Sequence, residues 1–117
     1  MDRWGRIRIP SDFLKTFKEK FGDEVFVTSM DDKNIQIYPL KVWYGLVDNL
    51  YKGKKDELML RQFLMKTNYN GQRGRIDRHW RIQIYSFPRK KINLEGKINI
   101  KGREDHLELM PARMYLY

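Results

Sequence analysis

The sequence predicts an α+β protein built from two similar halves that share one hydrophobic core. The pattern Asp-Arg-x-x-Arg-Ile-x-Ile occurs twice, at residues 2–9 and 77–84, and the same order of strand, helix and hairpin signals follows each copy. A chain of 117 residues is about one domain long, so neither half is large enough to bury a core of its own. We therefore interpret the two repeats as half-domains.

The first half begins with a predicted strand and a predicted helix. Residues 6–9 alternate polar and β-branched side chains, which is typical of a half-buried strand, and Pro10 ends the run. Ser11 is a suitable helix N-cap and Gly22 a suitable stop. Phenylalanines recur every four residues between them, at Phe13, Phe17 and Phe21. This spacing indicates a helix face that packs on the core rather than an aromatic surface for a ligand.

A hairpin and two helices are predicted next. Alternating runs at 25–27 and 35–37 flank a turn-forming segment and predict a hairpin that ends at Pro39. Apolar residues at helical spacing then predict one helix over 40–50 and a second from Asp56 to Leu64, with a lysine-rich loop between them. These two helices connect the halves.

The second half repeats the order of the first. Residues 68–71 predict a turn, and 72–76 predict a strand that leads into the second copy of the motif. Residues 86–94 take the place of the helix, and 98–109 predict the second hairpin. The first copy has a single residue ahead of Asp2, so a counterpart of the 72–76 strand is missing there. Either the chain is truncated or another segment fills the gap, and in both cases we expect a sheet edge that is open to a neighbour.

The composition restricts the classes of function. The chain has no cysteine, which excludes a disulfide framework and thiolate metal sites, and it contains no apolar stretch long enough for a membrane span or signal peptide. We expect a soluble, cytoplasmic protein. Lysine and arginine number 24 against 15 acidic residues, and this net charge of +9 favours an anionic partner such as nucleic acid. The first 40 residues are balanced in charge, so the excess lies in the rest of the chain.

Signals for catalysis and for metal binding are absent from the sequence. There is no Ser/His/Asp or Cys/His set, no phosphate-binding glycine loop and no pair of carboxylates in a predicted cleft, so we expect neither an enzyme nor a cofactor. His79 and His106 lie in different halves, without carboxylates at ligand spacing. We therefore expect no metal site.

The repeated segments resemble the MraZ family, whose members are two-repeat bacterial regulators built from SpoVT/AbrB-type half-domains. The resemblance rests on DRWGRIRIP and VFVTSMDDKNIQIYPLKVW in the first half, and on RIQI with KINIKGREDHLELMP in the second. It covers nearly the whole chain. It implies two half-repeats interleaved as a swapped-hairpin β-barrel with a helical linker: residues 1–39 form the first AbrB-like repeat, 40–67 the linker and 68–117 the second repeat.

The resemblance also implies a function and partners. Members of the family form homo-oligomeric rings and regulate transcription by binding short direct repeats in double-stranded DNA, upstream of cell-division and cell-wall genes. The same would place this protein at the nucleoid in the cytoplasm, with no membrane partner and no small-molecule substrate. Two other interpretations remain open: a ring-forming structural or interaction protein that has lost DNA binding, and a basic protein associated with RNA or the ribosome.

The motif itself suits DNA recognition. An arginine held by a neighbouring aspartate presents a planar, charged fork to a phosphate or to the O6/N7 edge of guanine. The family motif maps onto Asp2, Gly5, Arg6 and Pro10 in the first copy and onto Asp77 and Arg81 in the second. We expect DNA contacts from Arg3, Arg6, Arg8, Arg78 and Arg81. Alternatively, each Asp–Arg pair only fixes a strand corner, and both roles can coexist.

The second copy departs from the family pattern at two positions. Trp80 stands at the glycine position and Tyr85 at the proline position, which puts a turn that needs no Cβ in doubt. We therefore expect Arg6 to contact DNA more strongly than Arg81. Trp80 and Tyr85 can stack on a partner, although packing within the protein or between subunits is the commoner role. The basic run 89–91 fits either a phosphate contact or a solvated surface.

Overall fold

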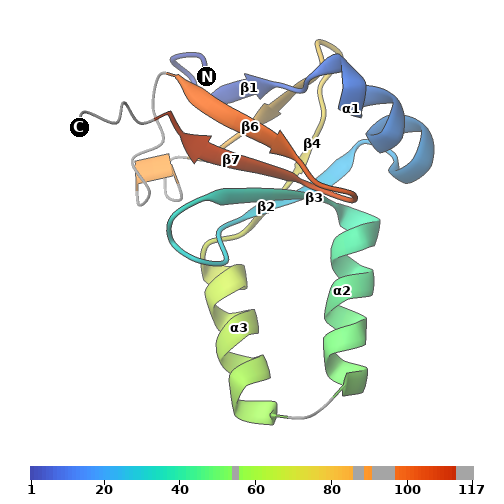
Figure 1. Cartoon of the computed structure of the whole chain (residues 1–117), viewed down its shortest axis with the longest axis vertical. Coiled ribbons are helices and arrows are strands. Elements are labelled where there is room, and N and C mark those ends of the chain that lie inside the picture. Colours follow the sequence, from blue (N-terminus) through green and yellow to red (C-terminus); the bar gives the residue numbers. More distant parts are fainter. Residues whose placement is uncertain (54–55, 86–88, 91–96, 113–117) are drawn as a thin grey trace.

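The computed structural model describes residues 1–53, 56–85, 89–90 and 97–112, which form two β-sheets and a helical hairpin (Figure 1). The predicted α+β class is confirmed. The strands that the structure describes lie in one two-stranded and one five-stranded sheet, and these sheets do not close into a barrel. No helix in the described ranges is long and apolar enough to cross a membrane.

The smaller sheet joins the two copies of the motif. Strand β1 (Arg6–Arg8) pairs antiparallel with β5 (Arg81–Gln83), with Ile7 opposite Ile82. Both isoleucines are buried because the alternation of a strand places them on the side of the core. The strand predicted from each copy is therefore confirmed, and the two strands lie side by side.

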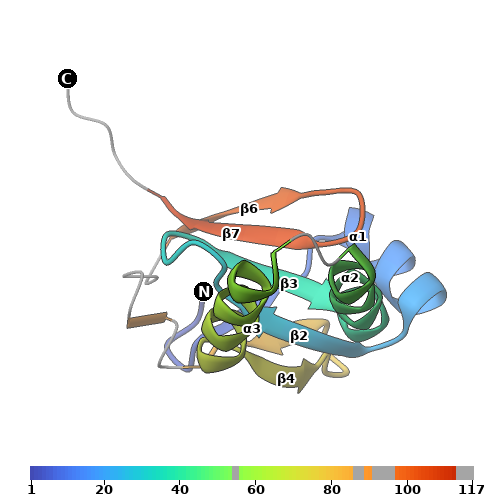
Figure 2. The same cartoon turned by 90° about the horizontal axis from the view of Figure 1, so that it is seen from below.

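The larger sheet interleaves the two halves. Its strands are antiparallel neighbours in the order β4-β2-β3-β7-β6 (Figure 2). Their bounds are Glu24–Thr28 for β2, Ile35–Pro39 for β3, Gln72–Arg75 for β4, Ile98–Gly102 for β6 and Leu107–Pro111 for β7. The predicted hairpins are thus β2–β3 and β6–β7. The two hairpins pair with each other through β3 and β7. Strand β4 of the second half pairs with β2 of the first half.

The core receives buried side chains from both halves. Its buried residues are Phe17 and the alternating aliphatic side chains of the strands and of the residues that directly follow them: Ile7, Ile9, Val25, Val27, Ile35, Ile37, Ile76, Ile82, Ile84, Leu107 and Leu109. Burying each of these large apolar side chains contributes about 1.5–3 kcal/mol before the loss of chain entropy is counted. Because both halves supply these side chains, the two halves form one cooperative unit.

The first helix differs from the prediction in its second part. An α-helix, α1 (Ser11–Lys15), continues as a π-helix, η1 (Thr16–Phe21), and ends at Gly22 with a φ of 87°. Residues spaced by four drift around an α-helix, which has about 3.6 residues per turn, and the wider π turn reduces this drift. Phe17 is buried, and Phe13 and Phe21 are partly buried against the same core, which confirms their predicted role.

The two helices of the predicted linker form a hairpin that projects from the sheet (Figures 1 and 2). Helix α2 spans Leu40–Gly53 and α3 spans Glu57–Tyr69, and the side chain of Asp56 caps α3 by accepting a hydrogen bond from the N–H of Met59 at 3.1 Å. The predicted turn at 68–71 is wrong in its first half, because Asn68 and Tyr69 still belong to α3.

The helix predicted over 86–94 falls largely outside the described residues. Arg89 and Lys90 are described and are helical, and the N–H of Arg89 donates to the carbonyl of Tyr85 at 3.2 Å.

Candidate nucleic-acid interface

The β1–β5 ribbon presents one polar, basic face. Since Ile7 and Ile82 point into the core, the alternate residues of both strands point the other way. These residues are Arg6, Arg8, Arg81 and Gln83, and the register places Arg6 opposite Gln83 and Arg8 opposite Arg81. Two like charges directly opposite each other on one face repel. An anion bound between Arg8 and Arg81 would relieve this repulsion.

The turn before β1 is closed by Asp2. One carboxylate oxygen of Asp2 accepts hydrogen bonds from the N–H groups of Trp4 at 3.0 Å and Arg6 at 2.9 Å. The other oxygen accepts from Nε of Arg6 at 2.9 Å. Gly5 lies in this turn with a φ of 79°, a left-handed conformation that strongly favours glycine. Asp2 therefore fixes both the backbone of the turn and the direction of the Arg6 guanidinium.

The turn before β5 has the same geometry. Asp77 accepts from the N–H groups of His79 at 2.8 Å and Arg81 at 2.9 Å, and its second oxygen accepts from Nε of Arg81 at 3.2 Å. Trp80 occupies the position of Gly5 and takes the same left-handed conformation, with a φ of 63°. The doubt that the missing glycine raised about this turn is therefore removed.

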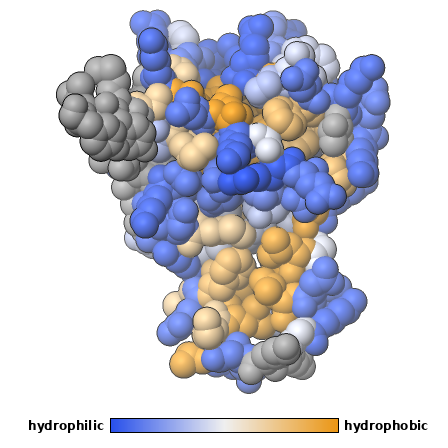
Figure 3. Space-filling view, in the orientation of Figure 1, coloured by the Kyte–Doolittle hydropathy of each residue, from blue (hydrophilic) through white to orange (hydrophobic). Residues whose placement is uncertain are grey.

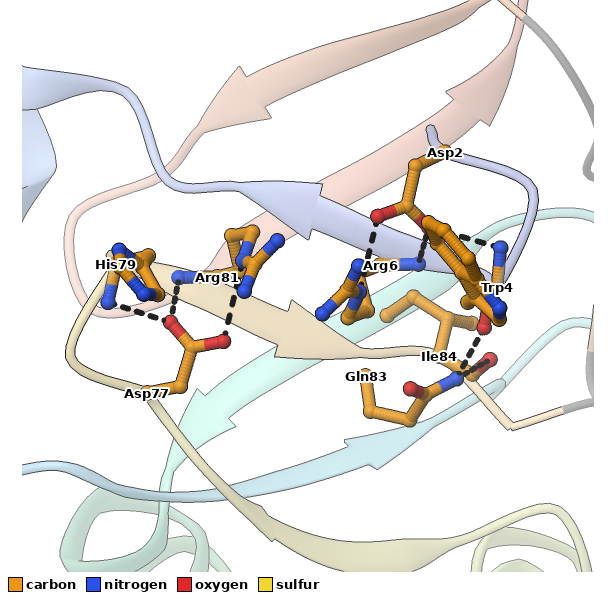
Figure 4. Close-up of polar contacts among 8 residues, drawn as sticks. All are labelled: Asp2, Trp4, Arg6, Asp77, His79, Arg81, Gln83 and Ile84. Carbon is orange, nitrogen blue, oxygen red and sulfur yellow. Dashed lines mark hydrogen bonds and ion pairs between the residues drawn. The ribbon is translucent and has the colours of Figure 1, made fainter.

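Two hydrogen bonds join the turns across the ribbon. The N–H of Ile9 donates to the carbonyl of Trp80, and the N–H of Ile84 donates to the carbonyl of Gly5, each at 2.8 Å. The pattern is symmetric, because Ile9 and Ile84 are equivalent positions in the two copies of the motif, as are Gly5 and Trp80. Figure 4 shows the result: the Arg6 and Arg81 side chains lie between the two aspartates, on the same side of the ribbon.

The two arginines have equivalent surroundings. Their side chains are 27% and 26% exposed, respectively. Each guanidinium uses Nε to bind its own aspartate, and no described residue accepts a hydrogen bond from the Nη groups of either one. The outer edge of each fork is therefore available to bind an anion.

The same hydrogen bonds stabilise the ionised aspartates. The backbone N–H of Arg6 is the main reason that the pKa of Asp2 lies below its ordinary value. For Asp77, partial burial alone would raise the pKa, but the N–H groups of Arg81 and His79 together with the Arg81 guanidinium lower it. Both carboxylates therefore stay charged at neutral pH, where a nucleic acid would be bound, and both Asp–Arg pairs persist there.

The other predicted residues surround this face. Arg3 stacks on the ring of Trp4, with its Cζ 4.3 Å from the ring centroid, and Arg6 lies 4.9 Å from the same centroid. Arg78 is exposed on the second turn. Pro10 connects β1 to α1, and its carbonyl accepts a hydrogen bond from the N–H of Phe13 at 2.9 Å. These residues therefore lie on or beside the two turns.

Three further side chains belong to the site. Trp4 is 56% exposed beside two arginines, a pattern that its sequence neighbours could have indicated. Gln83 stands where the first copy has Arg8, and its Nε2 donates to the carbonyl of Trp4 at 2.6 Å. Arg89 packs against Gly5, because a Cβ at Gly5 would lie 2.6 Å from its Cζ. No sequence signal indicated this last contact, which joins residues far apart in the chain.

The aromatic and histidine candidates have local contacts. The ammonium of Lys18 lies 4.0 Å from the ring centroid of Trp80, and the hydroxyl of Tyr85 donates to the carbonyl of Arg73 at 3.5 Å. His106 stacks on Tyr38 with 4.3 Å between ring centroids. Across the described ranges, no group of three His, Asp or Glu side chains is placed to hold a metal ion.

Comparison with known proteins finds relatives of one kind. No protein-family model matches the chain. Curated proteins named "Transcriptional regulator MraZ" are similar along nearly all of it. The protein from Acidobacterium capsulatum is 29% identical over 109 residues, covering 93% of this chain and 75% of its own. Those from Koribacter versatilis and Leuconostoc mesenteroides are each 27% identical, covering 96% of this chain and 77% and 76% of their own, respectively.

Proposed function

Since the chain belongs to the MraZ family of transcriptional regulators, we propose that it regulates transcription by binding specific duplex DNA as a homo-oligomer. In this proposal the polar face of the β1–β5 ribbon is the DNA-binding surface. Arg6 and Arg81 reach the DNA with the outer edges of their guanidiniums, and Arg3, Arg8 and Arg78 add contacts around them. The site is then a binding surface rather than an active site.

One observation carries this proposal: two arginines, far apart in the chain, are fixed in the same way on one face. Each is held by an aspartate through Nε, at 2.9 Å for Arg6 and 3.2 Å for Arg81. A guanidinium held in this way has lost side-chain freedom before it binds, so less entropy is lost on contact with a phosphate or a guanine. The approximate two-fold relation of the two forks suits the repeating backbone of a duplex.

Homo-oligomerisation, in the form of a ring, is supported by the surface of the helical hairpin. Figure 3 shows a continuous apolar area over α2 and α3. The exposed apolar side chains of these helices include Leu50, Leu58, Met59 and Met65. A groove of about 420 Å³ lies between the two helices and is lined in part by Leu50 and Met59. Monomeric proteins rarely expose large contiguous apolar patches, so a second copy of the chain is the proposed cover. Several subunits on adjacent DNA repeats would then bind through effective concentration.

The finer architecture and the targets are part of the same proposal. The pairing of β3 with β7 and of β1 with β5 supports two half-repeats interleaved in the manner of a swapped-hairpin barrel, with 1–39 and 68–117 as the repeats and 40–67 as the linker. Short direct repeats upstream of cell-division and cell-wall genes are the proposed targets, by resemblance to the family. The proposed location is the nucleoid, in the cytoplasm.

An alternative function is favoured by a specific observation. Each Asp–Arg pair is also a complete strand-corner ion pair, in which the aspartate accepts hydrogen bonds from both the backbone and the side chain of the arginine. The forks are then structural, and the protein is a ring-forming interaction protein without DNA binding.

A salt-dependent binding measurement separates the two. The purified protein is titrated with a duplex from its own upstream region and with a scrambled duplex of the same composition. We expect tighter binding to the upstream duplex and a loss of about 100-fold in affinity between 50 and 200 mM salt if about four phosphates are contacted. Equal affinity for both duplexes would contradict specificity, and no binding at low salt would favour the alternative.

A further inference from the structure

In each turn of the β1–β5 ribbon, a basic side chain from another part of the chain lies over the left-handed residue. The guanidinium of Arg89 lies over Gly5, because a Cβ at Gly5 would lie 2.6 Å from its Cζ and 2.7 Å from its Nε. Lys18 of η1 lies over Trp80, with its ammonium 4.0 Å from the ring centroid. Neither cation is among the arginines that the proposed function assigns to DNA.

The two cations lie at opposite ends of the ribbon. Arg89 follows β5 in the chain and covers the turn before β1, whereas Lys18 follows β1 and covers the turn before β5. Because β1 and β5 are antiparallel, these two turns lie at opposite ends of the strand pair. In Figures 1 and 2, residues 89–90 accordingly lie on one side of the molecule, and α1 with η1 lies on the other. The two cations therefore share the approximate two-fold relation of the two Asp–Arg pairs.

The residue at the left-handed position of each turn allows the cation to approach. Trp80 takes the conformation of Gly5, so this conformation alone does not exclude a side chain. In the first turn, however, a Cβ would overlap the Arg89 guanidinium, so the absence of a side chain leaves the space that this guanidinium occupies. In the second turn, the indole ring offers Lys18 a face that attracts a cation without neutralising its charge.

Neither cation is neutralised by the part of the chain that the structure describes. No acidic side chain there pairs with Arg89 or Lys18, and Nε of Arg89 is buried without a hydrogen-bond partner. Buried polar groups in folded proteins nearly always have a partner, so an unpartnered one calls for an explanation. A phosphate at the outer side of the guanidinium would supply acceptors for its other N–H groups together with the opposite charge. Lys18 is exposed, so its ammonium is also accessible to an anion.

Each cation also lies beside one of the two arginines that their aspartates hold. Gly5 directly precedes Arg6, and Trp80 directly precedes Arg81. Each strand of a duplex carries one phosphate per ~3.4 Å of helix axis, so an arginine that reaches the edge of a base has backbone phosphates close to it. A second cation next to that arginine is well placed to bind one of these phosphates.

We propose that Arg89 and Lys18 bind phosphates of the DNA backbone at the two ends of the ribbon. This inference rests on the proposed function and extends its binding face by one cation at each end. Phosphate contacts fix the position of a protein on a duplex but carry no sequence information directly. Arg89 and Lys18 therefore contribute affinity and alignment on any duplex. The preference for the upstream duplex comes from Arg6 and Arg81.

The test is the salt dependence of binding by Arg89→Ala and Lys18→Ala, after circular dichroism and light scattering have confirmed the parental fold and mass. The matched controls are Lys90→Ala and Lys20→Ala, which remove the same charge from neighbouring exposed positions. We expect each test variant to bind the upstream and the scrambled duplex more weakly by the same factor. The slope of the logarithm of the association constant against the logarithm of salt concentration should become less steep by about 0.9. Each control should change this slope far less.

Two further variants separate phosphate binding from a purely structural role. Arg89→Gln keeps much of the packing on Gly5 but no charge, so it should change the salt slope as Arg89→Ala does. A residue that only packs on the turn would alter the melting temperature and leave this slope unchanged. Trp80→Ala removes the ring under Lys18 and should weaken binding. Combined with Lys18→Ala, it should cause little additional loss, because both substitutions act on the same contact.

The failure of this inference and the failure of the proposed function give different results. An unchanged salt slope in Arg89→Ala or Lys18→Ala, or an equal change in the matched control, would overturn the inference and leave the proposed function standing. A loss of affinity confined to the upstream duplex would also overturn it, because these residues would then read sequence. If the parent protein binds neither duplex at low salt, the proposed function fails and this inference fails with it.

Discussion

Asp2 and Asp77 use their two carboxylate oxygens differently: one organises the backbone of a turn and the other orients an arginine. A hydrogen bond from a charged or backbone donor to a carboxylate is stronger than one between neutral side chains. Each aspartate therefore couples the shape of its turn to the position of the arginine that follows. Loss of either aspartate should disturb both.

The low pKa values of these aspartates predict how stability changes with acid. A carboxyl whose pKa is lower in the folded than in the unfolded state stabilises the fold above its ordinary pKa of 3.8. This contribution is lost as the pH falls through the lower pKa of the folded state. We expect the melting temperature to fall below about pH 4. Asp2→Asn and Asp77→Asn should be less stable at neutral pH and less sensitive to acid.

Asp48→Asn is the control for this measurement. Asp48 pairs with Lys52 on exposed α2, where an ion pair contributes little. We expect Asp48→Asn to respond to acid like the parent protein. If Asp2→Asn also responds like the parent protein, the hydrogen bonds of the turn have no part in acid stability.

Gly5 gives a second prediction at this scale. Its φ of 79° costs a residue with a Cβ about 1–2 kcal/mol, and a Cβ would also displace the Arg89 guanidinium. We expect Gly5→Ala to lower the free energy of unfolding by about that amount in urea titrations. Gly45→Ala, in helix α2 with open space around it, should instead raise the free energy by about 0.5–1 kcal/mol. Changes of the same sign in both variants would contradict this account.

Trp80 shows why parts of the site could not be predicted from the sequence. A bulky residue is rarely left-handed, so the missing glycine predicted a different turn. In the structure the hydrogen bonds of Asp77 and the ribbon bond from Ile9 hold Trp80 in the conformation of Gly5. These bonds depend on the pairing of β1 with β5. The conformational preference of a single residue cannot predict such a pairing.

At the scale of elements, local patterns predicted most strands and helices. Alternating aliphatic residues identified β1, β2, β3, β5, β6 and β7, because every second side chain of each strand packs on the core. Strand β4, with the sequence Gln-Arg-Gly-Arg, carries no such pattern and was predicted from its place before the second motif. The residue pattern did not predict the change from the α-helix α1 to the π-helix η1. It also did not predict that α3 extends to Tyr69. The pattern also did not predict which strands pair. The order β4-β2-β3-β7-β6 depends on the pairing of β2 with β4 and of β3 with β7, whose residues lie far apart in the chain.

Phe17 tests the packing of α1 and η1 on the sheets. It is 2% exposed, and truncating a buried phenylalanine typically costs about 3–5 kcal/mol, which approaches the whole stability of a small domain. We expect Phe17→Ala to be largely unfolded or to melt far below the parent protein. Tyr44→Ala, at an exposed position of α2, should change the melting temperature little. Superimposed melts of Phe17→Ala and the parent would contradict the assigned helix face.

At the scale of the whole molecule, the apolar helical hairpin predicts self-association. Met59 is exposed and lines the groove between α2 and α3. We expect Met59→Lys to reduce the mass of the assembly measured by light scattering, because it places a charge in the proposed contact, while the circular dichroism spectrum is unchanged. Glu57→Lys, at a polar exposed position of the same helix, should keep the parental mass. A parental mass for Met59→Lys would place the contact elsewhere.

The most direct test of the DNA-binding face compares Arg6→Ala and Arg81→Ala on upstream and scrambled duplexes, after light scattering has confirmed the parental mass. The sequence alone predicts a weaker DNA contact from Arg81 than from Arg6. Because the structure holds both guanidiniums alike, we now expect each variant to lose about 1–3 kcal/mol of binding free energy on the upstream duplex and part of the preference for it. Arg61→Ala, which removes an equal charge from exposed α3, should lose much less. Parental affinity in both Arg6→Ala and Arg81→Ala, or an equal loss in Arg61→Ala, would contradict the assignment of this face to DNA.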